Sequence, residues 1–244
     1  TINLPSFREL SPNAYDNDEE GLTITGNPAV ERAIVRTLGT RLEYYPEAQE
    51  WVTVGGFVKE FESPIEDIRV SGATPQKTFA NAKSALNIGA ELDWRISLGR
   101  LAKPVRDFYF TGNLTYIQSE IELDTSIGTL ANTTINRPLS FQSPYVINLI
   151  LEYDNPEIGT QANLLYNVYG SRLVVVGIEG QPDQYERPVN QLDFTLSQAL
   201  SGGFKLGFKV QNILNARRLF DNGYEYNRNP GSGITASAKL SWSY

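Results

Sequence analysis

A run of acidic residues is the first feature of this sequence that suggests chemistry. Positions 16–20 read Asp-Asn-Asp-Glu-Glu, and several carboxylate and carbonyl oxygens on one short segment are the ligands that Ca²⁺ prefers. The same composition also describes a solvated surface loop. We favour the solvated loop and therefore predict no metal site.

The remaining charged residues give little support for catalytic activity. Glu91, Asp93 and Arg95 alternate along the chain, and Arg106 precedes Asp107. We interpret them as charges that pair with one another or with a neighbouring part of the protein. The sequence contains no His and no Cys, so zinc, haem and Ser-His chemistry lose their usual ligands and bases. We predict no catalytic residues, no cofactor and no enzymatic activity.

The composition of the chain limits the kinds of molecule that it can bind and the kinds of membrane segment that it can contain. The formal net charge of −7 argues against nucleic acid as a partner. No apolar stretch approaches the roughly 18 residues of a transmembrane helix, although a transmembrane β-barrel would give only a weak signal of alternation. The sequence contains no Met, even at position 1. This suggests a fragment or a processed chain, with any export signal upstream of Thr1.

Strict alternation of apolar and polar residues is the informative pattern, and it is clearest between Leu86 and Leu98. Every even position there is apolar and no odd position carries a bulky apolar side chain. The segment 234–244 repeats the pattern. Successive side chains of a strand point to opposite faces, so each segment has one apolar and one polar face. Noisier alternation occupies 34–45, 51–61, 108–122, 145–153, 161–169, 191–199 and 204–213.

The sequence therefore predicts about nine antiparallel strands, and their lengths favour a membrane. Several span about 10–13 residues, whereas globular strands average about 5–6 and a tilted membrane-crossing strand needs roughly 9–11. The connections alternate between short and long. The long ones cover 62–83, 124–144, 170–190 and 214–232. Outer-membrane barrels have short periplasmic turns and long extracellular loops.

This pattern gives a domain division and an orientation. Residues 1–32 are predicted to be an extracellular loop segment, and 33–244 the strands of an antiparallel transmembrane β-barrel. Aromatic residues should form two girdles at the membrane interfaces. The predicted periplasmic girdle contains Tyr44, Tyr45, Trp51, Phe108, Tyr153, Phe204, Trp242 and Tyr244, and the opposite one Phe61, Tyr116, Tyr145 and Tyr169. High β propensity of aromatic residues is the alternative explanation.

Several short motifs resemble a known family. The opening Ser6–Pro12, SFRELSP, resembles the FRELSP loop of TonB-dependent outer-membrane receptors of the Bacteroidetes type. Further similar stretches are GNP at 26–28, LGTRLEYYP at 38–46, GFVK at 56–59, SPIE at 63–66, RPL at 137–139, QSPY at 142–145 and VQNILN at 210–215. Each match is weak alone, but together they follow the family's order over almost the whole chain.

The resemblance implies a barrel of about 22 strands closed by an N-terminal plug, of which this chain supplies the C-terminal strands. It implies energised import of a scarce nutrient across the bacterial outer membrane. The implied partners are membrane lipid, the rest of the barrel and the plug, the TonB complex through that plug, and a surface lipoprotein. Ligand contacts would lie in the four long connections. The family's C-terminal barrel-assembly signal would correspond to Leu240, Trp242 and Tyr244.

Three alternatives remain open at this stage. A passive or structural outer-membrane barrel would lack the upstream plug and the TonB-contacting segment. An outer-membrane enzyme would need a nucleophile and a base, which the absence of His disfavours. A soluble β-sandwich would bury the apolar faces against a second layer of protein instead of exposing them.

Overall fold

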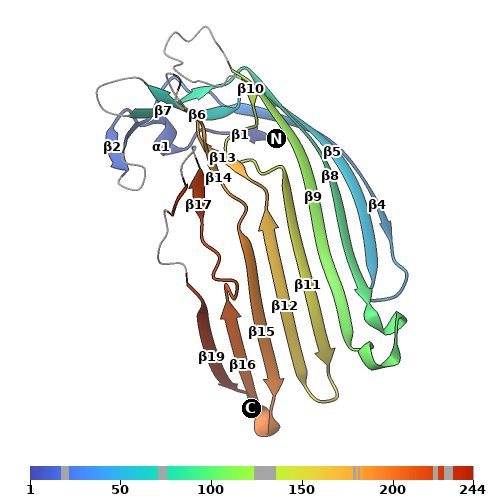
Figure 1. The fold of residues 1–244 in the computed structure, drawn as a ribbon. Coiled ribbons are helices and arrows are strands. Elements are labelled where there is room, and N and C mark those ends of the chain that lie inside the picture. Colours follow the sequence, from blue (N-terminus) through green and yellow to red (C-terminus); the bar gives the residue numbers. More distant parts are fainter. Residues whose placement is uncertain are drawn as a thin grey trace.

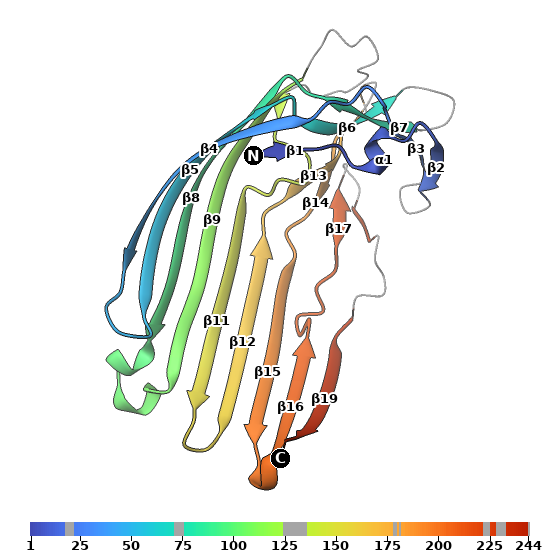
Figure 2. The same ribbon diagram turned by 180° about the vertical axis from the view of Figure 1, so that it is seen from behind.

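The computed structural model is built around one large, curved antiparallel sheet (Figures 1 and 2). It describes residues 1–17, 22–70, 76–123, 136–177, 180, 182–221, 225–227 and 233–243. All nine predicted strands are present, and each pairs with its neighbour in sequence order. They are β4 (Ala33–Tyr44), β5 (Trp51–Glu62), β8 (Ser84–Ser97), β9 (Phe108–Glu122), β11 (Tyr145–Asn155), β12 (Thr160–Tyr169), β15 (Asn190–Ala199), β16 (Phe204–Gln211) and β19 (Thr235–Trp242).

Two short strands extend this sheet at one end. β1 (Ile2–Asn3) pairs with the start of β4, and β10 (Asn136–Arg137) pairs with the end of β9. The sheet does not close into a barrel within the described residues, because β4 and β19 lie far apart in the order of strands. Both strands therefore present backbone groups that another strand would have to satisfy.

The connections between strands separate into two kinds at opposite ends of the sheet (Figure 1). The short turns include 3₁₀ helices at Leu98–Arg100, Lys103–Val105 and Ser201–Gly203. Gly202 and Gly203 have φ angles of 73° and 78°, in the left-handed region that glycine adopts without strain. We call this side of the sheet the short-turn end and the other side the long-loop end.

At the long-loop end the connections fold into two small sheets that the alternation did not predict. One has the order β2 (Ala14–Asn17), β3 (Leu22–Thr25), β7 (Gln76–Asn81) and β6 (Ile65–Val70). The other has the order β13 (Arg172–Val175), β14 (Gln184–Glu186), β17 (Leu219–Asp221) and β18 (Glu225–Asn227). Strands of three to six residues carry too few positions for a period-2 signal to stand out.

The short helix α1 (Phe7–Leu10) was also missed. Its capping box was a readable signal, since Ser6 and Glu9 have the spacing of that motif. The Ser6 hydroxyl accepts from the Glu9 N–H, and the Glu9 carboxylate accepts from the Ser6 N–H. Four residues give no helical periodicity, so only the cap could have identified it.

Motifs that are distant in the sequence meet around this helix. The Asn27 N–H of the GNP motif donates to the carbonyl of Glu9 in the SFRELSP motif at 2.6 Å. A Cβ atom on Gly26 would lie 2.3 Å from the Ser11 carbonyl oxygen, so the close approach of these two segments requires glycine. The described residues of the segment 1–32 therefore pack with other connections at the long-loop end, where β3 pairs with β7. Their predicted extracellular position stays a prediction.

Buried apolar residues gather at the long-loop end and not between two layers of the large sheet. Ile24, Val30 and Phe79 form one buried cluster. Ala82, Ala85, Ile121 and Leu123 form another, against which Phe61 and Leu139 pack. In the described part of the chain, no helix has the length and apolar character needed to cross a membrane.

Candidate functional site

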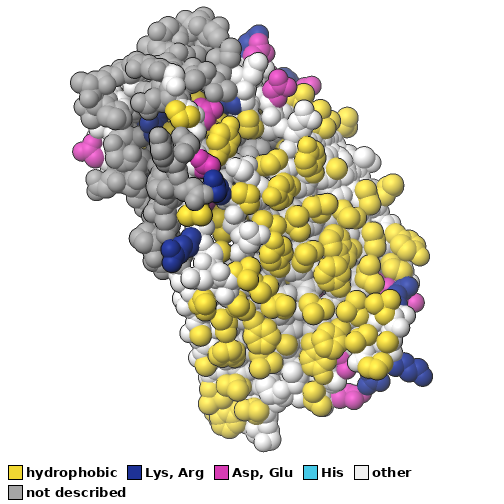
Figure 3. Space-filling model, in the orientation of Figure 1, with side chains coloured by type: hydrophobic (Ala, Val, Ile, Leu, Met, Phe, Trp, Pro, Cys, Tyr) yellow, Lys and Arg dark blue, Asp and Glu magenta, His cyan; other side chains and the backbone are white. Residues whose placement is uncertain are grey.

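One face of the large sheet is apolar and exposed, and we call it the outer face. In β8 it carries Leu86 and Ile88, which are 39% and 49% exposed, and in β4 and β19 it carries Leu38 and Leu240, at 78% and 64%. The registers place the apolar positions of all nine strands on this same side. Figure 3 shows hydrophobic side chains spread across the strands. No second layer of described residues covers them, as the β-sandwich alternative would require.

Five of the aromatic residues assigned to the periplasmic girdle lie on the outer face near the short-turn end. Phe108 and Tyr153 are paired residues of β9 and β11 with ring centroids 4.9 Å apart. Phe204 and Trp242 pair across β16 and β19 at 6.3 Å, and Tyr44 belongs to the same face of β4. This arrangement agrees with a girdle of rings at one edge of an apolar band.

Three aromatic residues assigned to the girdles are on the opposite, inner face. The Trp51 ring lies near Arg95, Phe61 packs into the buried cluster, and the Tyr169 hydroxyl donates to Glu186 at 2.9 Å. The prediction for these three was wrong because it used their distance along the strand and ignored which way they point. Tyr116 and Tyr145 do share the outer face at the long-loop end. Tyr244 lies outside the described residues.

The inner face carries polar side chains that bond across strands. Asn167 donates to Asn148 at 2.6 Å, and Asn148 donates to Asn113 at 2.8 Å, so three neighbouring strands are linked by one row of amides. Arg95 forms an ion pair with Glu152 and lies 4.4 Å from the centroid of the Tyr109 ring. Arg95 therefore pairs with another charged residue on the inner face, as the sequence analysis expected.

A buried carboxylate joins two turns at the short-turn end. Glu50, 3% exposed, accepts from the Ser97 N–H at 3.0 Å and from Arg100 Nε at 3.1 Å. Its second oxygen lies 2.6 Å from Arg100 Nη2. The hydrogen bond from Arg100 lowers the pKa of Glu50 below its ordinary value, and that from Ser97 adds to the effect. The nearby Arg106 and Asp107 form the predicted local pair at 3.4 Å.

At the long-loop end, Glu186 of β14 joins the strands of the second small sheet. Its carboxylate is fully buried and accepts from Arg172 at 2.7 Å, from Arg218 at 2.5 Å and from Tyr169. Burial alone would raise the pKa of Glu186. The hydrogen bonds from Arg218, Arg172 and Tyr169 outweigh burial, so the pKa lies below its ordinary value.

A second buried ion pair joins two of the sequence motifs. Arg137 of the RPL motif donates to Glu66 of the SPIE motif at 2.9 Å, and their side chains are 1% and 6% exposed. The Ser140 hydroxyl also donates to Glu66, at 2.8 Å. Sequence analysis did not single out Glu50, Glu186 or this pair as interacting residues. For Arg137 and Glu66, membership of two matched motifs was the available signal.

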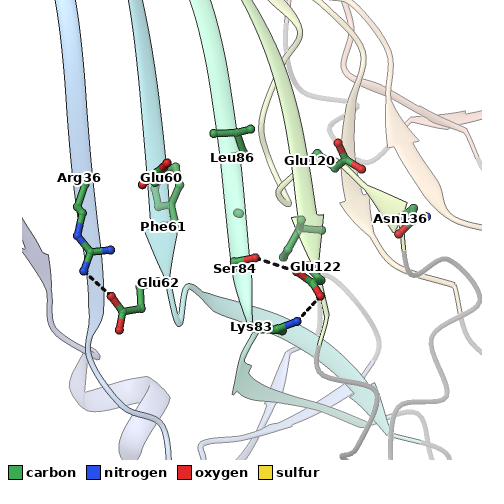
Figure 4. Close-up of a pocket in the computed structure, with 12 residues that line it drawn as sticks. Arg36, Glu60, Phe61, Glu62, Lys83, Ser84, Leu86, Glu120, Glu122 and Asn136 are labelled. Atoms are coloured by element: carbon green, nitrogen blue, oxygen red, sulfur yellow. Dashed lines mark hydrogen bonds and ion pairs between the residues drawn. The ribbon is translucent and has the colours of Figure 1, made fainter.

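An open hollow of about 570 Å³ lies where the wall strands meet the long-loop end, and Figure 4 shows the residues that line it. Arg36 and Glu62 form an ion pair across β4 and β5 at 2.8 Å, and Lys83 lies 2.5 Å from Glu122. The registers set Glu62 and Glu122 on the outer face, in line with Leu86 and Ile88. The apolar surface therefore ends in a band of charged residues, as expected where a membrane gives way to water.

The predicted acidic run is only partly visible. Asp16 accepts a hydrogen bond from the Thr23 hydroxyl at 2.8 Å, and residues 18–20 lie outside the described part of the chain. No group of three or more metal-ligating side chains occurs among the described residues. Of the proposed assembly signal, Leu240 and Trp242 lie exposed on the outer face of β19.

Comparison with solved structures identifies the fold. The chain is similar to a mutant of the ferric enterobactin receptor from Pseudomonas aeruginosa in complex with enterobactin, with a TM-score of 0.65 and 16% sequence identity over 100% of this chain and 37% of that one. It is similar to the copper transporter OprC, with a TM-score of 0.68 and 16% identity over 100% and 35%. No family model and no curated protein sequence matches the chain.

The FrpB iron transporter from Neisseria meningitidis matches with a TM-score of 0.60 and 12% identity, over 91% of this chain and 32% of that one. These neighbours are TonB-dependent receptors with β-barrel structure. The chain therefore has the fold of part of such a barrel, which confirms the predicted fold class and agrees with the family that its motifs resemble. It spans only about a third of the length of the structures that it matches.

Proposed function

We propose that this chain is part of the barrel wall of an outer-membrane transporter that imports a scarce nutrient with energy delivered by TonB. The observation that carries the proposal is the exposed apolar outer face that runs over all nine wall strands, with polar side chains on the inner face. A sheet with this polarity suits lipid outside and water inside. The likeness to receptors and transporters of this fold supports the same function.

The orientation follows from this proposal. The long-loop end would be extracellular, and the short turns would lie in the periplasm. The wall and its loops would bind and contain the cargo. A plug would respond to the TonB complex, and a surface lipoprotein would be a further partner at the loops. Leu240, Trp242 and Tyr244 would be read by the barrel-assembly machinery, with Leu240 and Trp242 presented by β19.

Fractionation of cells that express the full-length protein tests the location. We expect the protein in the outer-membrane fraction, extractable only with detergent, since the outer face would be covered by lipid. Release by salt or alkaline washing without detergent would contradict the proposal.

Uptake in cells with and without TonB tests the mechanism and separates it from a passive barrel. Growth should depend on the protein when the nutrient is scarce, and this dependence should disappear when TonB is deleted or the proton gradient is collapsed. A passive or structural barrel would give the same growth with and without TonB.

A further inference from the structure

We infer that the first loop sheet (β2, β3, β7 and β6) is a lid that moves as one body, and that the buried ion pair of Arg137 and Glu66 is the latch that holds it closed. Glu66 belongs to β6 of this sheet, while Arg137 belongs to β10, which pairs with the wall strand β9. Figures 1 and 2 show the sheet beside the upper ends of the wall strands. Such an opening requires neither cargo nor TonB, so it goes beyond the proposed function and can be measured in the purified protein.

The first loop sheet is held together by contacts of its own. Its buried cluster of Ile24, Val30 and Phe79 joins segments of two different connections, and the Asn27 side-chain amide donates to the Phe79 carbonyl at 2.9 Å. Among the described residues, none of its four strands pairs with a wall strand. The sheet can therefore keep its internal structure while it changes position.

The links between this sheet and the wall have the features of a hinge. The links 63–64 and 82–83, on either side of β6 and β7, are only two residues long. Ser63 has a φ angle of 54°, in the left-handed region that non-glycine residues rarely adopt. The Asn81 side chain donates to the Ser63 carbonyl at 2.8 Å and to the Glu31 carbonyl at 2.9 Å, so the roots of the sheet meet at one point. Hinges consist of a few such residues at the ends of elements, which absorb the change in backbone angles.

The segment 137–141, which carries the other half of the latch, is fixed to the wall. It begins in β10, which pairs with β9, and the Leu139 N–H donates to the Ser119 hydroxyl of β9 at 3.1 Å. The Phe141 N–H donates to the Leu173 carbonyl of β13 at 2.8 Å. The segment is therefore anchored on the wall and on the second loop sheet, which makes it the stationary half of the latch.

The ion pair of the latch is buried but only partly satisfied. Arg137 Nη1 donates to Glu66 Oε2 at 2.9 Å, and the Ser140 hydroxyl donates to the same oxygen at 2.8 Å. The side chains of Arg137 and Glu66 are 1% and 6% exposed, and among the described residues the Nε and Nη2 atoms of Arg137 have no hydrogen-bond partner. Buried polar atoms without a partner are rare, and each one costs stability. Opening would let water bond to these two atoms, so the latch is easier to open than a fully bonded buried pair.

A cavity of about 300 Å³ lies beside the latch. Glu66 and Ser140 line it from the latch, and Phe61 and Asn87 line it from the inner face of β5 and β8. When the latch opens, Glu66 moves away with the first loop sheet, and the cavity widens toward the long-loop end. The latch therefore regulates access to this part of the inner face.

Distances between pairs of spin labels, measured in the full-length protein in detergent, test the latch. This chain contains no Cys, so introduced cysteines carry the labels. Gln76→Cys marks β7 of the first loop sheet, and Glu157→Cys marks a short turn of the wall. With the latch intact, one main distance is expected. Glu66→Gln should raise the population of a second distance at least about tenfold, because it leaves Arg137 buried without its counter-charge. An unchanged distribution would overturn the inference.

The neighbouring carboxylate of β6 provides the matched control. Asp67 forms an ion pair with Lys77 inside the first loop sheet at 2.5 Å, so Asp67→Asn should leave the latch closed and the distance distribution single. A label at Ser171→Cys in place of Gln76→Cys reports on the second loop sheet and should not move when Glu66→Gln is introduced. If Asp67→Asn opened the lid as far as Glu66→Gln, or if both loop sheets moved, the assignment of lid and latch would be wrong.

Two substitutions of Arg137 separate its charge from its packing. Arg137→Met keeps much of the apolar stem but leaves Glu66 without a partner, so it should open the lid as far as Glu66→Gln does. Arg137→Lys keeps the charge and should leave most molecules closed. Hydrogen exchange of segment 76–81 tests whether the sheet moves as one body, and it should stay slow in Arg137→Met. Fast exchange there would show unfolding of the sheet instead of lid motion. Either that result or equal distance distributions for Arg137→Met and Arg137→Lys would overturn the inference.

Discussion

The wall and the loop sheets of this protein are stabilised in opposite ways. The wall exposes its apolar residues, such as Ile88 and Leu240, and turns polar residues inward. The loop sheets bury theirs, with Leu173 at 0% and Phe220 at 4% exposure, around the charged Glu186. The loops therefore resemble a small water-soluble domain with its own core. The wall has the polarity of a structure whose surrounding solvent is lipid.

The largest expected effect comes from a charge on the outer face of the wall. Leu114 lies midway along β9 between Leu92 and Ile147. Leu114→Arg should destabilise the protein by about 2–4 kcal/mol, because the guanidinium would face the middle of the membrane. Urea unfolding in lipid vesicles, followed by tryptophan fluorescence, measures the change.

The neighbouring residue provides the control for this substitution. Thr115 points to the inner face, so Thr115→Arg should change the free energy of unfolding much less. Equal losses in the two variants would mean that the two faces meet the same environment, and the contrast between wall and loops would then be wrong.

A smaller, local effect is expected from the carboxylate at the centre of the second loop sheet. Glu186→Gln removes the charge that pairs with Arg172 and Arg218. It should lower the free energy of local opening of segments 170–177 and 217–221 by up to about 1–3 kcal/mol. We expect the smaller values because both guanidiniums reach water. Hydrogen exchange measures the change. Glu157→Gln, at an exposed carboxylate in a short turn, is the matched control and should leave these amides unchanged.

The same carboxylate predicts a pH dependence that is confined to the loop sheet. Because the pKa of Glu186 is lowered in the folded protein, its stabilising effect is complete above the ordinary carboxyl pKa of 4.5. The effect is lost as the pH falls below that value toward the lowered one. Exchange in segment 182–187, corrected for the intrinsic rate, should be constant between about pH 5 and 8 and should rise in more acidic solution. A rise that begins near pH 7 would contradict the assignment.

The smallest effect is expected at the charged band between the two regions. Arg36 and Glu62 are 62% and 51% exposed, and exposed ion pairs contribute about 0–1 kcal/mol. Arg36→Gln should therefore leave the unfolding curve nearly unchanged in both salt-free and salt-containing buffer. A loss comparable to that of Leu114→Arg would show that the charged band contributes as much to the stability of the wall as the apolar face does.

The sequence by itself determined the wall. Alternation over ten or more residues gives each long strand an identity, a length and two faces, because side chains on a strand alternate strictly. The short and long connections also identified which strand ends lie together. Matched motifs pointed to the family fold, although they did not reveal that Glu66 of one motif pairs with Arg137 of another.

Only the tertiary structure showed how the loop strands fold and which charged residues pair. The strands of the loop sheets are too short for periodicity, and they are held by partners from other connections, as when β14 pairs with β17. The orientation of Trp51, Phe61 and Tyr169 depends on strand register and on packing at the inner face. A buried carboxylate such as Glu186 is indistinguishable in sequence from a solvated one, because it is held by hydrogen bonds from residues up to 32 positions away.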